Sequence, residues 1–155
     1  MHFCAAGREG GRPHLVPIAM QADRGSGTTT TLLVDDDDVV RGFCCSILTA
    51  RGFTVLEAAN GFEALLISAK FRGAIDILIT DLEMPGISGA ELGRAFNELW
   101  PGVNVLYVSG IPREVVGDQL PADCAFLPKP FAADALVTAI GKARVREGSA
   151  TKGKP

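Results

Sequence analysis

The chain has 155 residues, 47% of them hydrophobic, which is enough for one domain with a substantial core. Its 15 basic and 18 acidic residues give a net charge of −3, so there is no basic excess that would favour a nucleic-acid partner. Charged residues or glycines interrupt every apolar run, and the first residues lack the hydrophobic segment of a signal peptide. We therefore expect a cytoplasmic protein with no membrane partner.

The two ends of the chain differ in composition from its middle. Residues 1–29 are rich in Gly, Arg, Pro and Thr and show no sustained hydrophobic period, and residues 147–155 are similar. We therefore expect a flexible N-terminal extension over 1–29, one folded domain over 30–146 and a flexible C-terminal tail over 147–155.

Strand and helix patterns alternate within the folded domain. The apolar runs that predict strands are residues 31–34, 53–58, 75–80, 103–108 and 125–127. Five helical stretches follow them, and the fourth is expected to be short, since it starts near Pro112 and is interrupted by Gly117. The alternation predicts an α/β fold: an open five-stranded parallel sheet with helices on both faces, doubly wound and flavodoxin-like.

The four cysteines carry no metal or redox motif. Cys4, Cys44, Cys45 and Cys124 form no CxxC pair, and the adjacent pair has poor geometry for bridging itself. We expect reduced, mostly buried thiols, with a redox role as the alternative.

Polar residues follow the predicted strands at their carboxyl ends. Asp35 and Asp36 follow the first strand, Asp81 the third, Ser109 the fourth and Lys129 the fifth. Ligands of open parallel sheets bind outside this edge, so we expect these side chains to converge there.

The first of these groups lies in a run of four consecutive carboxylates. Their mutual repulsion would be offset by a hard divalent cation, which prefers oxygen ligands. At the end of the strand, Asp35 and Asp36 are expected to bind Mg²⁺. For Asp37 and Asp38 we favour an ordinary place at a helix N-terminus, which suits carboxylates by itself.

The remaining groups suit phosphoryl chemistry. Asp81 ends a strongly apolar strand, where a carboxylate can be both a metal ligand and a nucleophile toward phosphorus. Ser109 could donate its hydroxyl to a phosphoryl oxygen, and Lys129, between two prolines, offers a point charge. The simpler interpretations are a turn aspartate, a turn serine and a surface lysine.

Four stretches together resemble the receiver domain of two-component response regulators, in the CheY-like superfamily. They are LLVDDDD with Arg41, ITDLEMPGISG, VLYVSG and FLPKPF, and the similarity extends over roughly residues 30–144. The resemblance implies that Asp81 is the phosphoacceptor and that Ser109 and Lys129 assist it. It implies a Mg²⁺ site made by Asp35, Asp36, Asp81 and the backbone carbonyl of Glu83.

The same resemblance implies a switch residue and a special peptide bond. The aromatic switch position falls on Phe126, which lacks the hydroxyl that a tyrosine would carry there. The family's lysine–proline bond is commonly cis, which would apply to the bond between Lys129 and Pro130.

The interpretation we favour is a single-domain receiver that is not an enzyme. It would take a phosphoryl group from a histidine kinase or phosphotransfer protein and switch its binding to an output protein that the sequence does not name. The alternatives are a receiver module separated from a hybrid histidine kinase, an unphosphorylated scaffold, and an aspartyl-phosphate phosphatase, to which Glu83 two residues after Asp81 gives a superficial likeness. The complete set of acceptor, metal and lysine residues speaks against the scaffold, and we find no convincing second catalytic acid or substrate-binding cap for the phosphatase.

Overall fold

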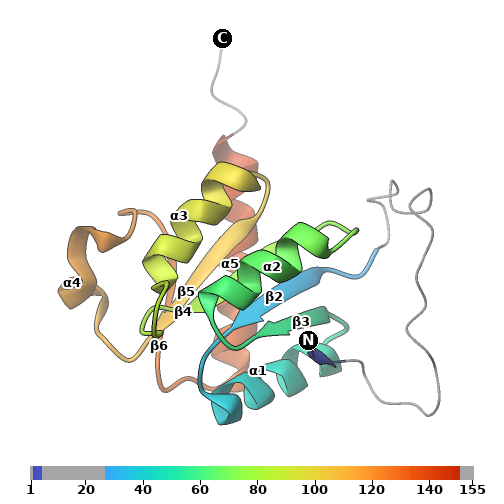
Figure 1. Ribbon diagram of the computed structural model, residues 1–155. Coiled ribbons are helices and arrows are strands. Elements are labelled where there is room, and N and C mark those ends of the chain that lie inside the picture. The colour runs from blue at the N-terminus through green and yellow to red at the C-terminus, as the bar shows by residue number, and fades with distance from the viewer. Residues whose placement is uncertain (1, 5–26, 151–155) are drawn as a thin grey trace.

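The structure, a computed structural model, describes residues 2–4 and 27–150, with side chains from 27 to 144. A six-stranded sheet forms its centre (Figure 1). The strands are β1 (His2–Cys4), β2 (Thr30–Val34), β3 (Thr54–Ala58), β4 (Ile77–Asp81), β5 (Asn104–Ser109) and β6 (Ala125–Pro128). Their order is β1-β3-β2-β4-β5-β6, and β2 to β6 are parallel, which confirms the predicted five-stranded parallel sheet.

The sixth strand was not predicted. β1 pairs antiparallel with β3, so His2–Cys4 extends the sheet at an edge where we had expected an irregular extension. The rest of that extension, apart from residues 27–29, lies outside the described residues.

Helices cover both faces of the sheet (Figure 1). They are α1 (Asp38–Ala50), α2 (Gly61–Lys70), α3 (Gly89–Leu99), α4 (Arg113–Val116) and α5 (Ala133–Ala150), with a 3₁₀ turn, η2 (Gly117–Gln119), directly after α4. One face is packed by α1 and α5, and the other by α2 and α3. The short α4 is confirmed, while α5 continues into the stretch that we had assigned to the tail.

Side-chain caps explain where the first three helices begin. Asp37 caps α1, Asn60 caps α2, and Ser88 caps α3 in a reciprocal capping box with Glu91. The interpretation of Asp37 as a helix cap is therefore confirmed. Each helix starts just beyond the carboxyl end of a strand, which leaves these ends free to form a site.

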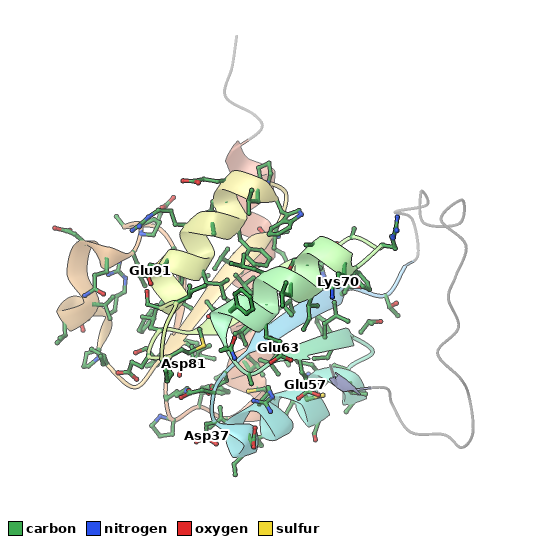
Figure 2. All side chains as sticks on the ribbon, in the orientation of Figure 1. Asp37, Glu57, Glu63, Lys70, Asp81 and Glu91 are labelled. Carbon is green, nitrogen blue, oxygen red and sulfur yellow. The ribbon has the colours of Figure 1, made fainter. Side chains whose placement is uncertain are left out.

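Apolar side chains fill the space between the sheet and the helices on each face (Figure 2). The alternation of a strand divides its residues between the two cores: Leu33 packs toward α1 and α5, whereas Leu32 and Val34 pack toward α2 and α3. A smaller cluster below α4 contains Leu82, Tyr107, Val116 and Leu120, with Phe126 against it.

The cysteines differ in their redox state. Cys44 and Cys124 are in the reduced form as expected, but Cys45 is disulfide-bonded, so the expectation of reduced thiols was wrong at that position. Successive residues of a helix point about 100° apart, so neighbouring cysteines have different surroundings. Across the residues that the structure describes, every helix is too short or too polar to cross a membrane.

Candidate functional site

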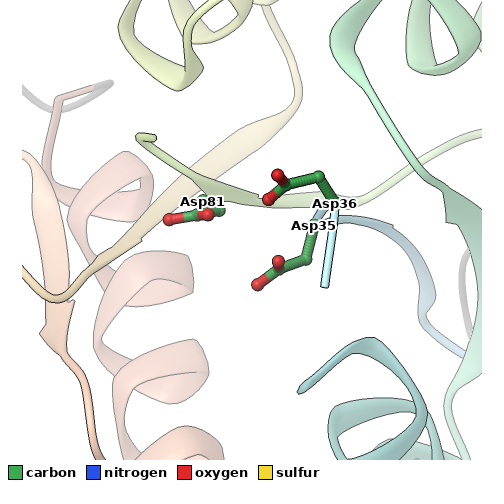
Figure 3. Close-up of side chains that lie close together, drawn as sticks. All are labelled: Asp35, Asp36 and Asp81. Carbon is green, nitrogen blue, oxygen red and sulfur yellow. The ribbon is translucent and has the colours of Figure 1, made fainter. Parts of the chain in front are cut away.

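Three carboxylates meet at the carboxyl edge of the sheet. Asp35 follows the last residue of β2 and Asp81 ends β4, on the strand that pairs with β2. Both are buried, whereas Asp36 is exposed. Carboxylate oxygens of all three lie within 4.8 Å of one another, and the carboxylates of Asp35 and Asp36 are turned toward the side where Asp81 lies (Figure 3). The predicted convergence of these residues is therefore present.

Backbone hydrogen bonds hold the acidic turn between β2 and α1. The N–H of Asp35 donates to the carbonyl of Ala58 at 3.2 Å, which continues the pairing of β2 with β3 by one residue. The Asp35 carboxylate accepts the N–H of Asp37 at 2.9 Å. The turn therefore presents Asp35 and Asp36 in a defined position beside β4.

Lys129 supplies positive charge to this group of acids. Its ammonium donates to Asp35 at 2.9 Å and lies 3.5 Å from a carboxylate oxygen of Asp81. Burial lowers the pKa of Lys129, but the hydrogen bond and charge of Asp35 and the charge of Asp81 outweigh it, so its pKa lies above the ordinary value. Lys129 therefore stays charged. Its peptide bond to Pro130 is cis, as expected.

Burial perturbs the ionisation of Asp81. Burial raises its pKa to about 6, with a smaller upward effect from Asp35, and Lys129 only partly compensates. Perturbed carboxylates of this kind concentrate at functional sites. An aspartate that is close to its ionisation point near neutral pH is available as a nucleophile or ligand once further positive charge arrives.

Close packing fixes the main chain around Asp81. Gly89, the first residue of α3, donates its N–H to the carbonyl of Leu82 at 3.1 Å. A Cβ atom built on Gly89 would lie 2.1 Å from the carbonyl oxygen of Asp81, so only glycine fits without displacing the chain. The second glycine of the GISG stretch thus has a packing role at the site.

Ser109 and Phe126 lie on the two strands beyond β4. Ser109 follows Val108, the register partner of Asp81, so it ends β5 at the same edge of the sheet. Its buried hydroxyl oxygen accepts the N–H of Ile111 at 2.9 Å. Phe126 is half-buried in β6 opposite Tyr107, away from the carboxylates.

Sequence analysis gave no role to a basic residue beside the acidic turn. The guanidinium of Arg41 donates to the backbone carbonyl of Asp35 at 2.7 Å and approaches Glu57 of β3 at 3.5 Å. Two signals in the sequence pointed to it: Arg41 accompanies one of the four matching stretches, and Glu57 lies at an inward-facing position of a predicted strand, where an acid requires a partner of opposite charge.

The donor set fits a hard divalent cation. Three carboxylates face one ammonium here, and oxygen ligands at this spacing are those that Mg²⁺ accepts together with water. A pocket of about 470 Å³ adjoins Asp36 and is lined also by Asn60, Phe62 and Pro85, so this side of the site opens outward.

Comparisons with known proteins point to one family. The family described as the response regulator receiver domain matches residues 31–141. The chain is 41% identical over 95 residues to the sensor kinase CckA of Brucella abortus, covering 60% of this chain and 10% of the kinase. It is 30% identical to the response regulator receiver protein CpdR of the same organism, covering 66% of this chain and 86% of CpdR.

A solved structure gives the same result for the fold. The receiver domain of the hybrid histidine kinase CckA superposes with a TM-score of 0.63 at 36% identity, covering 74% of this chain and 98% of that domain. The chain spans only about a tenth of the full sensor kinase and about a fifth of the regulatory protein DctD of Rhizobium meliloti.

Proposed function

Because the chain belongs to the response regulator receiver domain family, we propose that it accepts a phosphoryl group on Asp81 and thereby switches its binding to a partner. The donor would be the phosphohistidine of a histidine kinase or phosphotransfer protein. One observation carries the proposal: the buried carboxylate of Asp81 lies 3.5 Å from the ammonium of Lys129 and close to two further acids that can hold Mg²⁺. We expect this role in the cytoplasm, as a switch and not as an enzyme with turnover.

The chemistry assigns each side chain a task. A carboxylate oxygen of Asp81 forms the new bond to phosphorus. The bond from phosphorus to the imidazole nitrogen of the donor breaks, and the nitrogen keeps the electron pair of that bond. Lys129 would place its charge against an oxygen of the transferring group, and Ser109 would donate its hydroxyl to another. Positioning and charge neutralisation supply most of the catalysis in such transfers.

Asp35, Asp36, Asp81 and the backbone carbonyl of Glu83 would hold the Mg²⁺. When bound, the ion would neutralise charge on the carboxylates and on the incoming phosphoryl oxygens. Asp36, the exposed member, borders the outward-facing pocket from which a donor could approach.

The similarity to CckA supports a second candidate, a receiver that operates within a hybrid histidine kinase. In that case the donor would be a histidine of the same kinase system, and the chemistry at Asp81 would be unchanged. The two candidates differ in partner and agree on the site.

Intact mass spectrometry after incubation with a small acyl phosphate and Mg²⁺ tests the proposal. The wild-type chain should gain one phosphoryl group, and chelation of Mg²⁺ should prevent the gain. Asp81→Asn should not be modified. Asp134→Asn is the matched control, because Asp134 is exposed at the start of α5, and this variant should be modified like the wild type.

Two results would overturn the assignment. One is a phosphoryl group on a residue other than Asp81 in the wild-type protein. The other is sustained hydrolysis of a phosphomonoester in excess over protein, since that would identify a phosphatase and not a switch.

A further inference from the structure

Arg41 connects the acidic turn to the neighbouring strand. It lies in the first turn of α1, and its side chain is only 14% exposed. One nitrogen donates to the backbone carbonyl of Asp35 at 2.7 Å, a second bonds the carboxylate of Asp38, and a third approaches Glu57 at 3.5 Å. These partners belong to three successive elements: the turn, the helix and β3.

The contact with Asp35 involves the peptide unit that joins Asp35 to Asp36. The orientation of this peptide decides the direction in which Asp36 leaves the turn. The Asp35 side chain has its own anchors in Lys129 and the N–H of Asp37. Arg41 acts on the other side of the same residue, through its carbonyl, and so influences where the exposed Asp36 carboxylate meets Asp35 and Asp81.

Glu57 explains why Arg41 keeps this position. Val55 faces the α1 and α5 core, and the alternation of β3 turns Glu57 to the same face, where its side chain is 14% exposed (Figure 2). A carboxylate this far from water requires a charged partner, which Arg41 provides. The planar guanidinium can donate in several directions at once, which a lysine ammonium on a flexible stem does less well.

We propose that Arg41, held by Glu57, is a positioning residue that orients the Asp35–Asp36 peptide and thereby sets the affinity of the acidic turn for Mg²⁺. The inference rests on the proposed function, because it assumes that the three carboxylates bind the ion. Asp38 is 85% exposed and contributes little to the arrangement.

Electrostatics and positioning predict opposite effects of removing Arg41. Loss of a positive charge next to a cation site should strengthen Mg²⁺ binding if charge alone matters. Loss of a group that orients ligands should weaken binding, typically by ten- to a hundredfold for partners of metal ligands. The sign of the change therefore distinguishes the two.

The experiment measures Mg²⁺ affinity by calorimetric titration, and unfolding by denaturant in EDTA, for a set of variants. Arg41→Met and Arg41→Lys should each weaken Mg²⁺ binding, the former by about tenfold or more. The double variant Arg41→Met/Glu57→Leu replaces both charged partners by apolar groups, so its stability should exceed that of Arg41→Met while its affinity stays low. Arg51→Met is the matched control, since Arg51 forms an exposed pair with Asp134, and its affinity should stay within about twofold of the wild type.

The outcomes separate the two proposals. A wild-type chain that binds no Mg²⁺ contradicts the proposed function itself. A wild-type chain that binds Mg²⁺, together with a folded double variant that binds as tightly or more tightly, contradicts the positioning role alone. If the double variant does not fold, Arg41→Lys decides, because unchanged affinity in that variant excludes the need for a guanidinium.

Discussion

The ionisation of Asp81 is the residue-scale property that most directly reflects the site. Its side chain is 5% exposed, and burial raises its pKa to about 6 from the ordinary value of 3.8, against the opposing charge of Lys129. A raised pKa means that the folded chain holds the proton more tightly than the unfolded chain. This residue therefore favours folding at low pH, and its contribution is lost as the pH rises from about 4 to about 6.

The substitution Asp81→Asn removes this titration and keeps the size of the side chain. Between about pH 4 and pH 7 in EDTA, the wild type should lose stability that the variant keeps. The unfolding free energy of the variant should therefore rise relative to that of the wild type by about 1–3 kcal/mol. Denaturant unfolding at a series of pH values, followed by circular dichroism, measures the difference. If the unfolding free energies of the two proteins changed with pH in parallel across this range, Asp81 would ionise in the folded state as it does in water.

Much of the candidate site could be predicted from the sequence at this scale, and the reason is topological. Parallel strands bring their carboxyl ends to one edge, so residues that follow different strands, such as Asp35 and Asp81, had to converge. The partners of Arg41 could not be predicted in this way. The contact with Glu57 depends on which face of β3 meets α1, and the contact with the Asp35 carbonyl on the path of one side chain.

At the scale of elements, the start of α3 is packed against the end of β4 without room for a side chain. A Cβ atom on Gly89 would meet the carbonyl oxygen of Asp81 at 2.1 Å and the Cα of Leu82 at 2.7 Å. Backbone atoms cannot move aside like the end of a flexible side chain. We therefore expect Gly89→Ala to destabilise the fold by about 1–3 kcal/mol and to slow modification of Asp81.

A second helical glycine provides the control. Apart from its chain neighbours and the nearby backbone of its own helix, Gly42 in α1 has no atom within 4 Å of a built Cβ, so Gly42→Ala should stabilise the chain by up to about 1 kcal/mol through helix propensity. Thermal unfolding of both variants compares the two positions directly. Equal stabilisation by both substitutions would contradict the close packing of α3 on Asp81.

The elements themselves were predictable to different degrees. The five parallel strands carry apolar runs, and the caps at Asn60 and Ser88 mark the starts of α2 and α3. β1 has only three residues and no recognisable period, and its place depends on pairing with β3, so no local signal announces it. The end of α5 was missed because glycine and serine near its terminus resemble a tail.

At the scale of the whole molecule, β5 connects the carboxylates to the surface around α4. Ser109 lies at its end beside Asp81, and Tyr107, two residues earlier, is buried against Val116 and Leu120 of the α4 region. Phe126 pairs with Tyr107 across β5 and β6 and packs against the same cluster. A change at the end of β5 therefore has a short path of packed side chains to the α4 region.

This path leads to the last prediction, in which phosphorylation of Asp81 changes the burial of Phe126. A phosphoryl group would bring new acceptor oxygens to the sheet edge, and Ser109 would turn its hydroxyl toward them. That movement would break the hydrogen bond from the Ile111 N–H to the Ser109 hydroxyl oxygen. Ile111 belongs to the segment that leads from β5 into α4. Phe126 is half-buried and has no hydroxyl, so apolar area would drive its further burial, worth about 1–2 kcal/mol.

Side-chain NMR of Phe126, with and without a phosphoryl mimic and Mg²⁺, measures this coupling. The ring resonances should shift in the wild type, whereas Ser109→Ala should keep the modification of Asp81 and lose much of the shift. Phe53 serves as an internal reference, because it packs in the core beneath α1 and α5 and should not respond. Unchanged Phe126 resonances in a chain with Asp81 fully modified would mean that Phe126 is a static core residue. The signal would then reach a partner through the β4–α3 and acidic turns that surround the carboxylates.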